Sequence, residues 1–126
     1  MTAKNDGYTA LFHHTGVMMT QEAAGSNEFS FQDDFEVVGT IARDDTYALI
    51  CRAGDTRFSN LEEMIAWAKA NPGQLRFSVT YYGATHAVAA AMEKTMGIEM
   101  NQIDVGSSTA DRLTAFMADQ CDVLVV

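Results

Sequence analysis

The chain contains few cysteines, few prolines and few basic residues. Its 126 residues include one proline and two cysteines, Cys51 and Cys121, and two cysteines are too few for a disulfide scaffold. Eight lysines and arginines stand against 17 aspartates and glutamates, so the net charge is −9. Because the basic residues do not cluster, the sequence argues against binding to nucleic acid through phosphate contacts and against an anionic membrane surface.

Long hydrophobic runs are also missing. No apolar stretch approaches the roughly 20 residues that a membrane-spanning helix needs, and residues 1–7 lack the apolar region of a signal peptide. The hydrophobic fraction of 48% is nevertheless too high for a disordered chain. We therefore expect one small globular domain or a piece of a larger one.

Short apolar segments alternate with amphipathic segments, which predicts an α/β protein. The expected strands are at residues 8–12, 36–42, 46–51, 75–80, 100–105 and 121–126. The expected helices are between residues 59 and 71, at 85–96 and at 108–119, with a weaker one at 16–24. Ser59 and Glu62 are predicted to form a capping box. Leu113, Phe116 and Met117 are predicted to form the buried stripe of the last helix.

The order of elements from residue 46 onward is β-α-β-α-β-α-β. Each crossover is long enough for a parallel connection, so we expect a three-layer unit built on a parallel sheet. The continuous apolar run at residues 121–126 predicts a strand covered on both faces of that sheet. Because no final helix follows this strand, we expect the chain to be a fragment.

Two loops follow strands of the predicted parallel sheet, where ligands of α/β proteins bind. They are residues 80–86 and residues 106–109, and both combine small or hydroxyl side chains with the start of a helix. Free backbone N–H groups there suit an anion such as a carboxylate, without a lysine or arginine. The alternative is that these serines and threonines only cap helices. Residues 106–109 are also compatible with a phosphate.

The sequence contains no pattern typical of a metal or catalytic centre. His13 and His14 are adjacent at a strand end, so their side chains should point to opposite faces and chelate poorly. His86 has no second ligand at a metal-binding spacing. Cys51 and Cys121 lie in apolar strand patterns and are predicted to be inert packing residues. We therefore predict no catalytic residue, no metal and no cofactor.

Several segments follow one another in an order that resembles a known receptor family. Residues 6–12 resemble a DGYTLL strand, and Thr15-Gly16 stands where the family has STG. Residues 61–75 are similar to LxELIxxAKANPGKL, the most specific stretch, and residues 78–86 follow the outline SxGxGSxxH. Further similar segments are at residues 34–42, 97–98 and 113–122. Together they resemble the Bug-type solute-binding receptors of tripartite tricarboxylate transporters, over essentially the whole chain.

This resemblance implies a lobe of the two-lobed type II periplasmic binding protein fold. Residues 1–35 would be a remnant of the first lobe, consisting of a strand, a ligand loop, a short helix and a connecting loop. Residues 36–126 would be the α/β second lobe. The resemblance also implies a periplasmic receptor rather than an enzyme. Such a receptor binds a small carboxylate between its lobes, without a cofactor, and delivers it to the membrane permease subunits of the transporter.

The resemblance and the two loops predicted from the residues together give the expected ligand-binding residues, which come from the first-lobe segment and from both loops. They are His14, Thr15, Gly16, Ser78, Thr80, Tyr81, Gly83, Ala84, Thr85, His86, Gly106, Ser107 and Ser108. The GxGS loop of the family is Thr80-Tyr81-Tyr82-Gly83 here, and these tyrosines could either narrow the pocket or stack on a ligand. Asp104 would oppose an anion if it faced the site.

Two other functions remain open at this point. One is a small flavodoxin-like or nucleotide- or phosphate-binding α/β domain, which could be an enzyme, with residues 106–109 holding the phosphate. The other is a protein that only assembles with itself, forming a homodimer through the exposed lobe interface.

Overall fold

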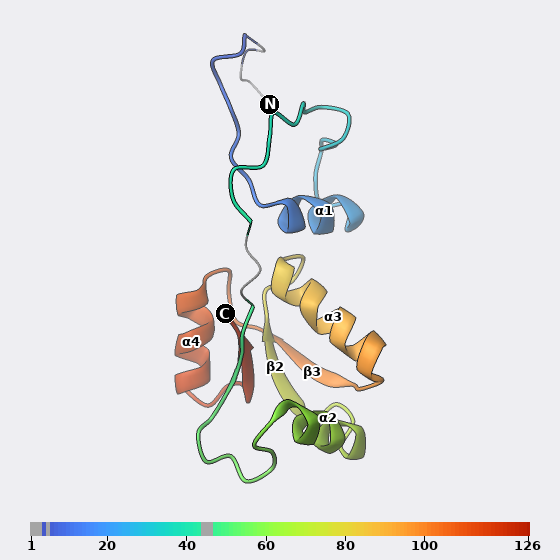
Figure 1. Ribbon diagram of the computed structural model, residues 1–126, viewed down its shortest axis with the longest axis vertical. Coiled ribbons are helices and arrows are strands. Elements are labelled where there is room, and N and C mark those ends of the chain that lie inside the picture. Colours follow the sequence, from blue (N-terminus) through green and yellow to red (C-terminus); the bar gives the residue numbers. More distant parts are fainter. Residues whose placement is uncertain (1–3, 5, 44–46) are drawn as a thin grey trace.

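The computed structural model describes residues 4, 6–43 and 47–126, and four helices and four strands lie within them (Figure 1). The elements in chain order are α1 Thr15–Ala23, β1 Leu49–Cys51, α2 Leu61–Ala70, β2 Leu75–Val79, α3 Ala84–Met96, β3 Met100–Asp104, α4 Thr109–Met117 and β4 Val123–Val125. None of the helices in this described part is long and apolar enough to cross a membrane.

The four strands form one mixed sheet in the order β1-β4-β2-β3. β2 is parallel to both β3 and β4, whereas β1 is antiparallel to β4. The prediction of an entirely parallel sheet is therefore wrong at β1. This strand adds to the outer edge of β4, and the backbones of Ala48 and Val126 exchange hydrogen bonds of 2.9 and 3.1 Å. Nothing local to β1 could predict that choice, because its partner lies about 75 residues further along the chain.

Helices cover both faces of the sheet, which confirms the predicted three-layer α/β architecture. Phe77 and Val79 of β2 and Val123 of β4 face α2 and α3, together with Met64 and Met92 from those helices. The opposite face is smaller: Leu124 of β4 packs there against Ala115 and Phe116 of α4. Figure 1 shows α4 on one side of the sheet and α2 and α3 on the other. The buried run Val123–Val125 is thus covered on both faces, as predicted.

The helices end close to the residues predicted from local capping signals, but the capping residues themselves are not always the predicted ones. The cap of α2 is Asn60, whose side chain accepts from the backbone N–H of Glu63 at 2.9 Å. The backbone N–H and hydroxyl of Ser59 donate to the Glu63 carboxylate, both at 2.8 Å. The predicted pairing of Ser59 with Glu62 is therefore wrong by one residue. Gly97 ends α3 in the left-handed conformation, with φ 63°, as the glycine at that position predicts.

The buried stripe of α4 differs from the prediction. Phe116 is buried, but Leu113 is 49% and Met117 73% exposed. Arg112 and Ala115 face inward with Phe116 instead. This inward face lets the guanidinium of Arg112 bond to Val125, Thr80 and Thr109 at the end of the sheet, contacts that hydrophobic spacing does not reveal.

The segment before the sheet contains α1 but no strand among its described residues. The predicted strands at residues 8–12 and 36–42 are wrong, because these segments are exposed and have no hydrogen-bonded neighbour there. Tyr8 is 94% and Val38 97% exposed. The three phenylalanines of the connecting loop, Phe29, Phe31 and Phe35, pack on one another with ring centroids 5.0–5.7 Å apart, and Phe31 is buried among them.

Candidate functional site

The loop between β2 and α3 forms a tight turn that leaves the start of the helix uncapped. The N–H of Gly83 donates to the carbonyl of Thr80 at 2.9 Å, and Tyr82 adopts a positive φ of 60° to close the turn. Gly83 occupies the N-cap position, so no side chain accepts from the first amides of α3. A Cβ at Gly83 would lie 3.0 Å from the Thr80 carbonyl, which explains the glycine. These amides are therefore available to an acceptor from outside the helix.

The loop between β3 and α4 is different, because its helix is capped by its own side chains. Ser108 accepts from the N–H of Asp111 at 3.1 Å, and the Asp111 carboxylate accepts from the N–H and hydroxyl of Ser108 at 3.1 and 2.7 Å. This is a complete capping box. Ser108 thus has the capping role that the sequence left open. The two loops are joined by the Thr80 hydroxyl, which donates to the carbonyl of Gly106 at 2.6 Å.

Helix α1 lies across the same end of the sheet. His14 caps it by accepting from the N–H of Gly16 at 3.1 Å. The hydroxyl of Thr20 donates to the carbonyl of Tyr82 at 2.6 Å and so connects α1 to the loop before α3. Figure 1 shows α3 and α4 both starting at the end of the sheet that faces α1.

A cavity of about 480 Å³ lies where α1 and these two loops meet. Its lining contains no aspartate or glutamate among the residues that the structure describes, although the chain carries 17 of them. The lining includes seven of the residues proposed from sequence: His14, Thr80, Tyr81, Gly83, Ala84, Thr85 and Ser107. It also includes Tyr82 and Thr109, which belong to the two loops predicted from sequence, and five residues that sequence reasoning missed: Val17, Gln21, Tyr47, Arg112 and Val126.

The other proposed residues lie outside the cavity lining. Ser78 is fully buried on the α4 side of β2, because strand alternation turns it away from Phe77 and Val79. His86 accepts from the N–H of Tyr82 at 3.3 Å. Four residues belong to loop or helix-start backbone near the cavity: Thr15, Gly16, Gly106 and Ser108.

Arg112 is the charged residue that sequence reasoning missed. Its Nε donates to the carbonyl of Val125 at 3.1 Å, its Nη1 to the hydroxyl of Thr80 at 3.2 Å and its Nη2 to the hydroxyl of Thr109 at 2.9 Å. The side chain is only 7% exposed and reaches the cavity lining. Residues 112, 115 and 116 share one face of a helix, so a prediction that turned this face inward would have identified Arg112 from the sequence.

Two tyrosines line the cavity beside the start of α3. The rings of Tyr81 and Tyr82 both meet the His86 ring edge-on, with centroids 5.1 and 6.2 Å apart. The Tyr81 hydroxyl donates to the carbonyl of Gln102 at 3.3 Å. Both tyrosines remain about half exposed, so they border the cavity without closing it. Asp104 accepts from the N–H of Gly106 at 3.2 Å and does not line the cavity.

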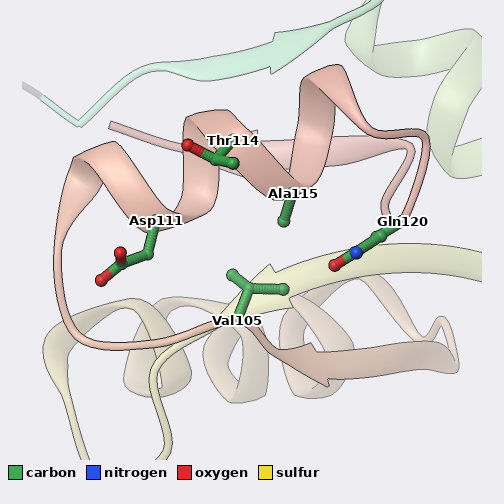
Figure 2. A pocket seen from close by; sticks show the side chains of 5 residues that line it. All are labelled: Val105, Asp111, Thr114, Ala115 and Gln120. Carbon is green, nitrogen blue, oxygen red and sulfur yellow. The ribbon is translucent and has the colours of Figure 1, made fainter.

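A second, smaller pocket of about 260 Å³ lies between α4 and the end of β3. Figure 2 shows its lining residues, Val105, Asp111, Thr114, Ala115 and Gln120. The Thr114 hydroxyl already donates to the carbonyl of Ala110 at 2.8 Å, and Asp111 belongs to the capping box. Among the described residues, the charged side chain in this lining is the Asp111 carboxylate, so the pocket is poorly suited to an anionic ligand.

The cysteines and histidines form no reactive cluster. Within residues 4, 6–43 and 47–126, no group of three or more His, Cys, Asp or Glu side chains could hold a metal ion. Both cysteines are free thiols. Burial raises the pKa of the Cys121 thiol, which keeps it protonated and unreactive. Cys51 is exposed on the edge strand β1, so its predicted packing role is wrong.

Comparison with known protein families connects this architecture to a transport system. The family model of the tripartite tricarboxylate transporter family receptor matches residues 1–126. Comparisons with curated proteins and with solved structures return no match. Receptors of this family are periplasmic solute-binding proteins, and a sheet with helices on both faces is consistent with one of their lobes. The resemblance inferred from sequence is therefore confirmed, and the chain belongs to the receptor family of tripartite tricarboxylate transporters.

Proposed function

We propose that this chain binds a small carboxylated metabolite in the cavity between α1 and the two loops, without catalysis. The observation that carries the proposal is the lining of that cavity, which combines an uncapped helix start, hydroxyl groups and one arginine with no acidic side chain among the described residues. In a chain with a net charge of −9, this is a local environment suited to an anion.

The thirteen residues proposed from sequence have two different roles in this proposal. We assign direct ligand contacts to those that line the cavity, with the backbone amides of Ala84 and Thr85 as the main donors. The remaining residues would shape the loops or hold the helix starts. Among these, Gly16 lies close to α3, since a Cβ on it would be 3.9 Å from the Cβ of Ala84.

The two-lobe division extends this proposal. Residues 1–35 would belong to the first lobe and residues 36–126 to the second. The cavity lies where α1 meets the end of the sheet, so ligand binding would hold these parts together. We place the receptor in the periplasm, with the membrane permease subunits of the transporter as partners and a homodimer as a second assembly.

The phosphate-binding alternative is less well supported. It relied on the start of α4, but the Asp111 carboxylate already accepts from the N–H of Ser108. A phosphate at that position would meet a negative charge and occupied donors.

Isothermal titration calorimetry tests the proposal by comparing citrate, glutamate and nicotinate with ATP. We expect saturable binding of at least one carboxylate and none of the nucleotide. The variant Ala84→Asp introduces a carboxylate into the cavity lining and should weaken carboxylate binding by about tenfold or more, because like charges repel at close range.

The matched control is Ala110→Asp. It adds the same charge to the first turn of α4, at a residue outside the cavity lining. Carboxylate binding should be nearly unchanged in this variant. Tight binding of ATP without a response to any of the carboxylates would contradict the receptor function and favour the nucleotide-binding alternative.

A further inference from the structure

Arg112 differs from Arg52, Arg57 and Arg76 in its lack of an acidic partner within the described part of the chain. Arg52, Arg57 and Arg76 each form an ion pair with an aspartate at 2.7–3.2 Å. Arg112 forms none with any described residue, although it is more deeply buried than these three. A buried cation without a counter-ion is unfavourable unless something else compensates its charge.

The partners of Arg112 are all neutral. They are the carbonyl of Val125 and the hydroxyls of Thr80 and Thr109. A guanidinium carries five N–H groups, so these three bonds leave one N–H on each terminal nitrogen without a partner among the described residues. Two such donors can receive both oxygens of a carboxylate. Because Arg112 lines the cavity, they are close to the space that a ligand would fill.

The position of Arg112 in its helix makes its buried charge more unfavourable. It is the fourth residue of α4, near the positive end of the helix dipole. Hydrogen bonds from Ser108 and, less strongly, the charge of Arg112 lower the pKa of the neighbouring Asp111, so this carboxylate offsets part of the Arg112 charge. It forms no ion pair with Arg112, however, and it lines the second pocket (Figure 2). The uncapped start of α3 adds further positive potential to the same cavity. An anion in the cavity would balance the buried charge of Arg112 and the positive potential at the starts of α3 and α4.

A purely structural role would not need the charge. The bonds to Val125 and Thr80 connect α4 to the ends of β4 and β2, and neutral donors could form them. We therefore propose that Arg112 pairs directly with a carboxylate of the ligand and gives the site its preference for acids over their neutral amides. This inference rests on the proposed function of the cavity.

The test compares two acids with their matched amides, nicotinate with nicotinamide and glutamate with glutamine, by calorimetry. Wild type should bind at least one acid more tightly than its amide, by about tenfold to a hundredfold. Arg112→Gln should abolish this preference. Arg52→Gln removes the same charge at the opposite end of β4 and should keep it, which separates a local effect from net charge.

A second measurement does not depend on a variant that folds. The NMR signal of the Arg112 side-chain Nε–H, assigned in wild type through its scalar couplings along the side chain, should shift saturably when the bound acid is titrated in. The matched amide should leave this signal in place.

The outcomes distinguish the two proposals. If an acid binds wild type, but Arg112→Gln keeps the same preference or the Nε–H signal does not move, the role of Arg112 is overturned and the receptor function stands. If no acid binds while inorganic phosphate shifts the signal, Arg112 is supported as an anion site and the receptor function fails. If none of these anions binds, both are overturned.

Discussion

At the scale of single residues, Asp122 is a buried carboxylate that two arginines share. It is 3% exposed, and its carboxylate accepts from Nη2 of Arg57 at 2.9 Å and from Nη2 of Arg76 at 2.8 Å. The backbone N–H of Arg76 adds a bond of 3.0 Å. Burial would raise the pKa of Asp122, but the hydrogen bonds from Arg76 and Arg57 outweigh it and hold the pKa well below the usual range.

We predict that Asp122→Asn lowers the free energy of unfolding by about 2–4 kcal/mol at pH 7, because it leaves two arginines without their shared partner. The pKa is lower in the folded than in the unfolded protein. The stabilisation is therefore complete above about pH 4, the ordinary range of an unfolded aspartate, and decreases as the pH falls below it. Urea unfolding monitored by circular dichroism from pH 7 to pH 3 should show wild type and variant converging at low pH.

The matched control is Asp119→Asn. Asp119 also pairs with Arg52 and Arg76, at 3.2 Å, but its side chain is 72% exposed. Water screens such exposed pairs, so Asp119→Asn should lower the free energy of unfolding by less than about 1 kcal/mol. Equal losses of unfolding free energy in the two variants would contradict the conclusion that burial strengthens the ion pairs of Asp122.

At the scale of elements, α1 is the least firmly held helix. None of its residues is buried, whereas α2, α3 and α4 all contribute to the two cores. The hydroxyl of Thr20 connects α1 to the loop before α3 by donating to the carbonyl of Tyr82 at 2.6 Å. The side of the cavity formed by α1 thus depends on few interactions, and its amides should exchange fastest among the helices.

We predict that Thr20→Val increases hydrogen exchange at the amides of α1 by about fivefold, the equivalent of one lost hydrogen bond. Exchange in α3 should not change. Mass spectrometry or NMR measures both helices in one experiment. Thr114→Val is the control, because its hydroxyl bonds only to a carbonyl within α4, that of Ala110. An unchanged rate in α1 would show that the Thr20 bond does not hold the helix in place.

The elements also show how far sequence reasoning reached. The strands β2, β3 and β4 and the helices α2, α3 and α4 follow the predicted order and lie within a few residues of the predicted bounds. Their signals are local, as in the stop at Asn71 and the left-handed Gly97. The strands predicted at residues 8–12 and 36–42 did not form, because a strand needs a hydrogen-bonded neighbour that a local pattern cannot supply.

At the scale of the whole molecule, the segment before the sheet leaves many apolar side chains in water. The most exposed of them are Tyr8, Phe12, Val37, Val38 and Ile41. They lie on extended stretches before and after α1 (Figure 1). Contiguous exposed apolar groups favour association, and extended segments without neighbours can add to another chain. This is the surface through which we propose that two copies assemble.

We predict a concentration-dependent dimer in analytical ultracentrifugation. Val38→Asp should weaken the dimer by about tenfold or more, because it places a charge where the dimer would bury an apolar side chain. Gln32→Asp, at another exposed position of the same segment, adds the same charge and should have little effect. A wild-type protein that stays monomeric at all accessible concentrations would contradict the homodimer.

The sequence by itself determined the α/β class, the order of the central elements, the receptor family and the two loops that border the cavity. These follow from hydrophobic period, capping residues and turn residues, which act over a few positions. Only the tertiary structure decided that β1 runs antiparallel to β4, that Arg112 turns inward and that Ser78 lies away from the cavity. Each of these depends on contacts between residues far apart in the chain, whose energies are set by burial and pairing in the folded protein.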